Sequence, residues 1–163
     1  MTTAFYHEGG FSCLYIRELF RLDTVISGYW LPTIRATIEI NRSDPSKAIE
    51  LLKAAAPYEL GLVASNQFGA LLYPAYVRGQ VYLLLHEGSK ATAEFQKFLD
   101  HRSLVANNPL FALAHLGLAR AYAMQGDTAK AKAAYQDFFT LWKDADPDIP
   151  IFIAAKAEYA KLQ

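Results

Sequence analysis

The feature of this chain that most limits its fold is a pattern of small and aromatic residues that returns after 40 residues. The pattern is a small residue, an aromatic, an alanine and a second aromatic, separated by steps of 3, 9 and 4 residues. Its two occurrences are Gly79, Tyr82, Ala91, Phe95 and Ala119, Tyr122, Ala131, Tyr135. A period of this length is typical of helical-hairpin repeats, in which each hairpin buries its apolar side against its neighbours. The sequence therefore predicts an all-α array of stacked hairpins.

Composition restricts the size and the partners of this array. The 163 residues are enough for one cooperative core, or for about three or four hairpins, and too few for two ordinary domains. Hydrophobic residues make up 53% and charged residues 20%, which predicts a folded chain rather than a disordered one. Sixteen basic residues balance sixteen acidic ones, so no net charge favours nucleic acid or an anionic membrane.

Targeting segments and cysteine usage indicate the compartment. Cys13 is the only cysteine and cannot form a disulfide within the chain, which favours a reducing environment. Residues 1–10 lack the basic and apolar parts of a signal peptide. No window has the run of about eighteen apolar residues that a membrane span needs. We therefore expect a soluble, cytoplasmic protein.

The first hairpin is predicted at about residues 23–57. Asp23 is the expected N-cap of a helix that ends near Asn41. Pro32 lies inside this helix and is expected to kink it or to delay its start. The pair Asp44-Pro45 then provides an N-cap and a first-turn proline for the second helix.

The second hairpin is predicted at about residues 72–103. Pro74 is placed in the first turn of a helix that ends near His86. The Gly-Ser pair at 88–89 is expected to break the chain, and the partner helix to run over about 90–101. This hairpin contains the first occurrence of the repeated pattern.

The third hairpin is predicted at about residues 109–143, with a break at Gly126 and Asp127 as the N-cap of its second helix. Pro150 is expected to start a last helix, at about 150–162, that caps the array. Its expected buried side is Ile153, Ala157, Tyr159 and Ala160, and its expected solvent side is Lys156, Glu158 and Lys161.

The recurring residues have packing roles. A small residue on each first helix lets the second helix approach closely, and these positions are Ala36, Gly79 and Ala119. The matching small positions on the second helices are Ala48, Ala91 and Ala131. The large residues that fill the space between hairpins are Tyr82, Phe95, Tyr122 and Tyr135.

This arrangement resembles the tetratricopeptide repeat, in which a small residue and Tyr on one helix meet Ala and Phe or Tyr on the next. The third hairpin is the closest match. The second matches with its turn shifted at Glu87-Gly88, and the first has Glu39 where an aromatic is expected. The period is 43 residues from Ala48 to Ala91 and 40 from there to Ala131, against about 34 in the family. The resemblance implies a solenoid of about three repeats with a C-terminal capping helix.

A narrower resemblance is to the C-terminal repeat region of large bacterial serine/threonine protein kinases, and similar arrays occur in bacterial winged-helix regulators. The stretches that carry it are 29–35, 48–52, 73–76, 131–137 and 142–150. None of the kinase's own motifs is present: the sequence has no glycine-rich phosphate loop, no His-Arg-Asp and no Asp-Phe-Gly. Any kinase activity would belong to a part that this chain lacks.

The beginning of the chain is expected to differ from the rest. Residues 17–22 resemble the end of the second helix of an earlier repeat. We therefore expect residues 1–22 to be the remnant of a preceding repeat, so that the chain begins inside an array. Residues 23–163 are expected to form the repeat domain.

No catalytic, cofactor or metal site is predicted. The four histidines, His7, His86, His101 and His115, do not have metal-ligand spacing with each other or with carboxylates. The aspartates at 144, 146 and 148 lack the glycine and glutamate that a calcium loop requires. The sequence therefore predicts a protein that is not an enzyme and needs no cofactor.

The resemblance implies that the first helix of each hairpin lines a concave face. The candidate binding residues there are Trp30, Thr33, Thr37, Tyr73, Tyr76, Gln80, Leu83, Leu113, Leu116 and Arg120. Some members of the family hold a C-terminal carboxylate with Lys and Asn at such positions, whereas this set is aromatic and aliphatic with one cation.

We therefore expect a non-catalytic protein-interaction module, the scaffold or regulatory part of a signalling protein, that binds an apolar or amphipathic helical segment. Two alternatives stay open for the candidate residues. They could pack against the last helix, or against a second copy of the chain through the concave face or the open N-terminal edge. In the second case the chain would be a homo-oligomerisation segment.

Overall fold

The computed structural model describes residues 24–61, 72–105 and 108–162, and every regular element in these ranges is helical. The elements are η1 (Ile26–Trp30), α2 (Leu31–Asn41), α3 (Pro45–Lys53), η2 (Ala56–Tyr58), α4 (Tyr73–Leu84), α5 (Gly88–Asp100), α6 (Arg102–Val105), α7 (Pro109–Met124), α8 (Thr128–Leu141) and α9 (Pro150–Ala160). The predicted all-α class is confirmed. Within the described ranges, no helix has the length and apolar character needed to cross a bilayer. The predictions for residues 1–22 lie outside them.

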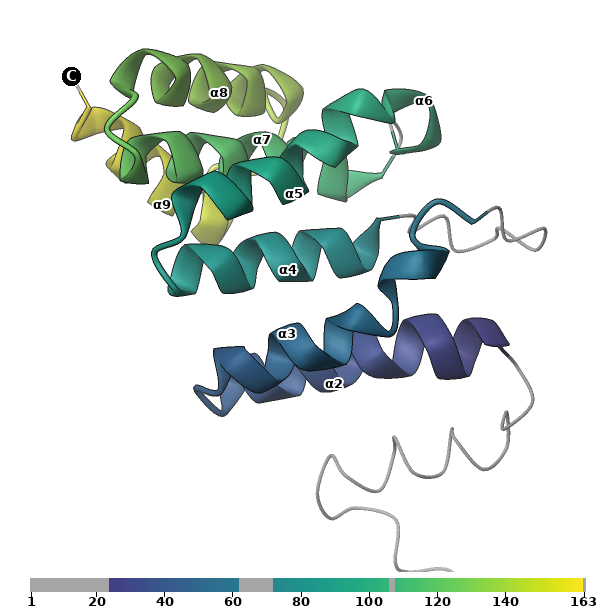
Figure 1. Ribbon diagram of the computed structural model, residues 1–163. Helices are drawn as coiled ribbons and strands as arrows, with labels where there is room; N and C mark the ends of the chain where they lie inside the picture. Colours follow the sequence, from purple (N-terminus) through teal and green to yellow (C-terminus); the bar gives the residue numbers. More distant parts are fainter. Residues whose placement is uncertain (1–23, 62–71, 106–107, 163) are drawn as a thin grey trace, which may run out of the picture.

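The long helices form antiparallel pairs, α2 with α3, α4 with α5, and α7 with α8 (Figure 1). Helix α4 packs against both helices of the first pair, and α7 packs against both helices of the second. Helix α9 packs on α8 at the far end of the molecule. Each pair therefore covers one side of the next.

The turns inside the three pairs have the same backbone conformation. Ser43, His86 and Gly126 have positive φ angles of 61°, 57° and 77°. The N–H of the residue after each donates to a carbonyl oxygen five residues back, at 2.8–3.0 Å. A left-handed residue with this long-range backbone bond is a common way to end a helix. The turns therefore recur with the spacing of the sequence pattern.

The predicted turn of the second hairpin is wrong. Helix α5 begins at Gly88, and His86 takes the left-handed position that Gly126 takes in the third hairpin. Gly88 has a different role, because a Cβ there would lie 2.8 Å from Cγ of Gln125 and 3.0 Å from the Ala121 oxygen. This glycine lets the start of α5 approach the end of α7, and the turn is not shifted.

Prolines and aspartates start the helices as predicted. The first-turn prolines are Pro32, Pro45, Pro74, Pro109 and Pro150. The carboxylate of Asp44 accepts from the Lys47 N–H, and that of Asp127 accepts from the Lys130 N–H. These bonds satisfy N–H groups that have no partner inside the helix. The predicted N-cap role of Asp127 is confirmed.

Pro32 changes the helix that precedes it. Residues Ile26–Trp30 form a π-turn, in which the Leu31 N–H donates to the Ile26 oxygen. Proline has no N–H to donate four residues back, and a π-turn is one way in which a helix absorbs such an interruption. Residues 24 and 25 are already α-helical, so the predicted delay of the helix start is not observed: the π-turn interrupts the helix just before Pro32, and α2 follows from Leu31. The expected cap, Asp23, lies outside the described residues.

The predicted buried side of α9 is wrong except for Tyr159, which is half-buried and packs against the apolar cluster. Phe152 and Ala155 are buried, whereas Ile153 is 52% exposed and Ala157 is also exposed. The Phe152 ring packs on the aromatic side chains of α8, with its centroid 6.2 Å from that of Phe138. Burial of the larger ring gains more than burial of Ile153, and it sets the rotation of the helix.

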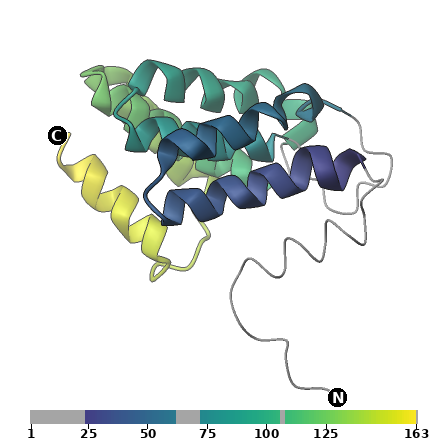
Figure 2. The ribbon, with the colours of Figure 1, turned by 60° about the horizontal axis from the view of Figure 1, so that its bottom comes forward.

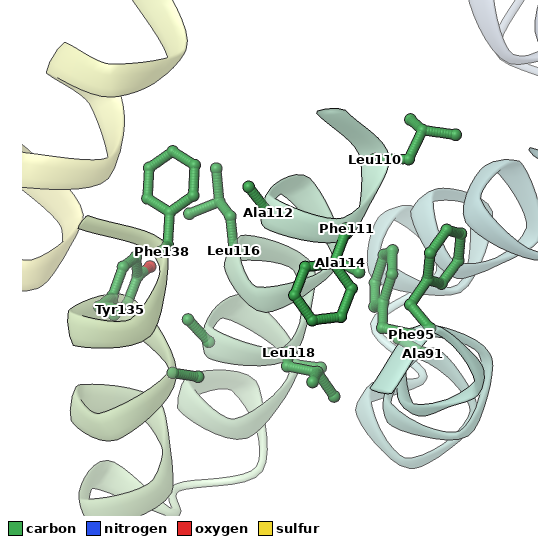
Figure 3. Close-up of a cluster of buried hydrophobic side chains, with 14 of the residues drawn as sticks. Ala91, Phe95, Leu110, Phe111, Ala112, Ala114, Leu116, Leu118, Tyr135 and Phe138 are labelled. Carbon is green, nitrogen blue, oxygen red and sulfur yellow. The ribbon is translucent and has the colours of Figure 1, made fainter. Parts of the chain in front are cut away.

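The buried cluster between α4, α5 and α7 depends on two glycines. A Cβ at Gly79 of α4 would lie 2.7 Å from the Phe95 ring, and one at Gly117 of α7 would lie 2.6 Å from it. Figure 3 shows Phe95 among the buried side chains of α5 and α7. The expected need for a small residue at Gly79 is confirmed. Gly117 is a second such position, which the repeated pattern does not mark.

The other small and aromatic positions of the pattern are also packed. The alanines of the pattern have no exposed surface; they are Ala36, Ala48, Ala91, Ala119 and Ala131. Tyr135 is buried, and Tyr82 and Tyr122 are half-buried. Each of these half-buried rings lies 5.5 Å from a lysine ammonium, that of Lys90 or Lys130.

Glu39 takes the place of these tyrosines in the first hairpin. Its carboxylate lies 3.2 Å from the ammonium of Lys47, which corresponds in the sequence to Lys90 and Lys130. An ion pair therefore replaces the cation–π contact, and the departure from the pattern is accommodated.

Replacement of Gly117 by Ala should lower the free energy of unfolding by about 1–3 kcal/mol, because the added methyl group overlaps a ring that is 1% exposed. Urea denaturation measures this change. Gly28→Ala is the matched control, since the ring it approaches, Tyr58, is 41% exposed and free to move aside. Equal destabilisation by the two substitutions would contradict this packing.

Candidate functional site

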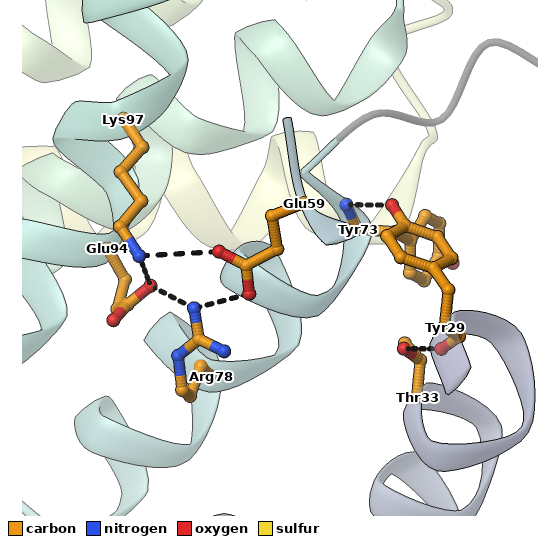
Figure 4. A network of polar contacts seen from close by, with 7 residues as sticks. All are labelled: Tyr29, Thr33, Glu59, Tyr73, Arg78, Glu94 and Lys97. Atoms are coloured by element: carbon orange, nitrogen blue, oxygen red, sulfur yellow. Dashed lines mark hydrogen bonds and ion pairs between the residues drawn. The ribbon is translucent and has the colours of Figure 1, made fainter. Parts of the chain in front are cut away.

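Two of the predicted binding residues, Trp30 and Tyr73, lie where the first and second helix pairs meet. The ring of Trp30 lies 5.9 Å from that of Tyr73, so η1 and the start of α4 are in contact through aromatic side chains. The Tyr73 N–H donates to the hydroxyl of Tyr29 at 3.1 Å. This bond satisfies a first-turn N–H of α4 and ties the aromatic group to the fold (Figure 4).

Two of the predicted residues are buried, and their assignment to a binding surface is wrong. Thr33 is 1% exposed, and its hydroxyl donates to the Tyr29 oxygen at 2.6 Å. Leu116 is 1% exposed and belongs to the large apolar cluster around Phe95. Both lie on first helices, as expected, but they face the neighbouring helices rather than solvent.

Two further residues contribute little to a surface site. Thr37 is exposed, but its hydroxyl donates to the Thr33 oxygen. Leu113 is half-buried against the apolar cluster. Neither residue lines the hollow described below.

The remaining four candidates lie on neighbouring parts of α4 and α7. Tyr76 is near both Gln80 and Arg120: burial raises the pKa of its hydroxyl, and these two neighbours partly offset that rise. Leu83 and Arg120 line a common hollow. We use the name α4/α7 face for Tyr76, Gln80, Leu83, Arg120, Ala123 and Met124.

The hollow on this face has a volume of about 510 Å³. Its lining residues are Leu83, His86, Arg120, Ala123, Met124, Tyr135, Glu158, Lys161 and Leu162. Leu83 and Ala123 hold equivalent positions in successive hairpins, 40 residues apart. The hollow is therefore an apolar surface between two hairpins, with cationic side chains beside it and α9 along one side.

A carboxylate of α9 occupies the polar end of the hollow. Arg120 donates to Glu158 through Nε and Nη2, each at 2.9 Å, and the Tyr135 hydroxyl donates to the same carboxylate at 2.8 Å. Burial alone would raise the pKa of Glu158, but the hydrogen bonds from Arg120 and Tyr135 outweigh it and hold that pKa below its ordinary value. Glu158 was expected to face water, but it is only partly exposed and is paired with Arg120 and Tyr135.

A second polar cluster links the first hairpin to the second. The guanidinium of Arg78 lies 2.6 Å from the Glu59 carboxylate and 2.8 Å from that of Glu94, and the Lys97 ammonium lies 2.8 Å from Glu94 (Figure 4). Burial would raise the pKa of Glu94, but Arg78 and Lys97 together lower it. Four charges that are paired with one another and mostly buried are best explained as a structural contact.

A second hollow, of about 430 Å³, lies between α5, α7 and α8. It contains His115, whose Nδ1 lies 3.5 Å from the Asp137 carboxylate. Burial lowers the pKa of His115, more than Asp137 raises it. Thr140 is also in the lining, but its hydroxyl donates to the Gln136 oxygen, so it is not arranged as a nucleophile.

Across residues 24–61, 72–105 and 108–162, no three His, Cys, Asp or Glu side chains come together as metal ligands. No protein-family model, curated protein or solved structure matches the chain. The α4/α7 face has an apolar hollow between equivalent helix positions, with Arg120 and Lys161 in its lining.

Proposed function

We propose that this chain is a non-catalytic protein-binding module, built as a tetratricopeptide-like solenoid of about three hairpins with α9 as its capping helix. In this proposal the α4/α7 face binds an apolar or amphipathic helical segment of a protein partner. The hollow of about 510 Å³ on that face is the observation that carries it.

The repeated turns support the solenoid. Ser43, His86 and Gly126 share the left-handed conformation, and the backbone bonds around them are the same. Each first helix packs on both helices of the preceding pair. Nearest-neighbour packing of equivalent hairpins is the general property of repeat proteins.

The chemistry of the hollow supports a helical partner. Leu83, Ala123, Met124 and Leu162 offer apolar contact area, and Arg120 and Lys161 offer positive charge near it. An amphipathic helix presents both kinds of group along one side, at steps of three and four residues. A flat, uniformly polar surface would not favour such a ligand.

The resemblance to the repeat region of bacterial serine/threonine kinases supports a place in a larger signalling protein. There the module would serve as a scaffold or a regulatory part, in the cytoplasm. Kinase chemistry would come from another domain, since the sequence contains none of its motifs.

A displayed library of short helical peptides, selected on the immobilised chain, tests the binding function. We expect the selected peptides to be amphipathic, and Met124→Glu to weaken their binding about ten-fold or more by placing a charge in the apolar hollow. Fluorescence anisotropy measures the affinities. Met124 is 39% exposed, so its replacement should leave the fold intact.

Ala133→Glu is the matched control, because Ala133 is exposed on α8 and does not line the hollow. Peptide binding that is as sensitive to Ala133→Glu as to Met124→Glu would contradict the proposed face. A stable dimer that Met124→Glu dissociates, seen by light scattering, would instead make this surface an oligomerisation contact.

A further inference from the structure

We propose that Arg120 and Tyr135 form a carboxylate-binding site that Glu158 fills within the chain, and that an acidic residue of a partner helix takes its place. Helix α9 then acts as an internal ligand that controls access to the hollow. This inference rests on the proposed function and adds to it the chemistry of the partner and a means of regulation.

The geometry of the pair is that of ligand recognition. Arg120 uses two nitrogen atoms for the two oxygens of Glu158, each at 2.9 Å, and this fork-like contact is specific for planar anions. The Tyr135 hydroxyl adds a third donor at 2.8 Å. Three donors from α7 and α8 therefore converge on one carboxylate, which comes from α9.

The contact can open without exposing a deeply buried charge. The side chains of Arg120 and Glu158 are 34% and 33% exposed, so water already reaches both. In the buried Arg78 and Glu59 pair the corresponding values are 8% and 7%. Separation of the α9 pair therefore has a much smaller desolvation cost than separation of a structural pair.

Helix α9 has the position of a detachable element. It contacts α8 far less extensively than the paired helices contact each other. Figure 2 shows it at the edge of the molecule, inclined to the other helices. A connection of eight residues, 142–149, precedes it, which leaves length for the helix to move.

The contacts of α9 also indicate what a replacing helix must carry. Phe152 packs on the rings of α8, and Glu158, six residues later, accepts from Arg120 and Tyr135. A partner helix would therefore need an apolar side with a Glu or Asp near its end.

A labelled peptide of residues 149–162, added to the full chain, tests this inference by fluorescence anisotropy. The internal helix competes at an effective concentration in the millimolar range, so the unaltered chain should bind the peptide weakly. Glu158→Gln in the chain weakens the internal contact and should tighten peptide binding about ten-fold or more. Glu50→Gln, an exposed carboxylate on α3, is the matched control and should have no effect.

A second comparison isolates the carboxylate. The Glu158→Gln chain should bind a peptide that carries Gln in place of Glu158 about ten-fold more weakly than the natural peptide. Equal binding of the two peptides would overturn the carboxylate site. Peptide binding that Glu158→Gln in the chain does not tighten would overturn the role of α9. Neither of these two outcomes contradicts the proposed function. The proposed function fails only if library peptides do not bind the α4/α7 face.

Hydrogen exchange on the unaltered chain tests the opening of α9 even if a variant does not fold. The amides of α9 should exchange at least about ten-fold faster than those of α7 and α8, because the helix opens on its own. Equal protection of the three helices would show that α9 opens only when the domain unfolds, and would overturn the inference.

Discussion

Replacement of Phe95 by Ala should lower the free energy of unfolding by about 3–5 kcal/mol, the range for loss of a large buried aromatic ring. Phe95 is 1% exposed and belongs to a cluster built by α4, α5, α7 and α8. Its ring touches the backbone positions Gly79 and Gly117 on two different helices, neither of which has a side chain to fill the space. The cavity therefore stays open, and the full cost should be observed.

Urea denaturation followed by circular dichroism measures this effect. Tyr58→Ala removes a ring of similar size that is 41% exposed, and it should cost far less. Similar losses for the two variants would contradict the placement of Phe95 between the hairpins.

Replacement of Arg78 by Met should also destabilise the chain by about 3–5 kcal/mol, because it leaves buried carboxylates without their cation. Glu59 and Arg78 are both more than nine-tenths buried, and Glu94 is nearly so. Lys97 stays close to Glu94 but lies 3.5 Å from Glu59, so it compensates only in part. Arg42→Met is the control, since Arg42 is 65% exposed in its pair with Glu39 and should contribute less than about 1 kcal/mol.

The same variant should change the pH dependence of stability. In the unaltered chain the pKa of Glu94 lies below its ordinary value, so its stabilising contribution is present above the unfolded pKa and is lost as the pH falls through the folded pKa. Without Arg78, burial should raise that pKa, and protonation should then relieve the unpaired charge. The difference in stability between the two chains should therefore shrink between about pH 5 and pH 3. A constant difference over this range would contradict the network.

Local signals made most of the helices predictable. Prolines at helix starts and the Asp44 and Asp127 caps act within a few residues, so the sequence alone reveals them. The small positions Ala91 and Ala131 repeat at a fixed spacing, and their burial followed from it. The turn at His86 was missed because a histidine there adopts a conformation that usually favours glycine.

Contacts between distant residues could not be predicted in this way. Glu59 lies in the connection after the first hairpin and Arg78 lies on α4, and nothing in the local sequence pairs them. Glu158 follows a polar pattern on α9, and only the rotation set by Phe152 brings it to Arg120. The sequence also does not show how the first helices are rotated about their axes. Thr33 and Leu116 were therefore predicted on the surface, although both are buried. A signal for Gly117 existed, since a glycine inside an apolar helix often marks a close approach.

The central claim is that the α4/α7 face is where a helical partner binds, and amide chemical-shift mapping tests it most directly. The labelled chain would be titrated with the tightest peptide from the displayed library. We predict that the largest shift changes fall on Gln80, Leu83, Arg120 and Ala123. Amides around the exposed residues Ala93 and Ala133, which do not line the hollow, should stay unchanged. Largest changes around Ala93 and Ala133 instead, with the α4/α7 face unaffected, would contradict the claim.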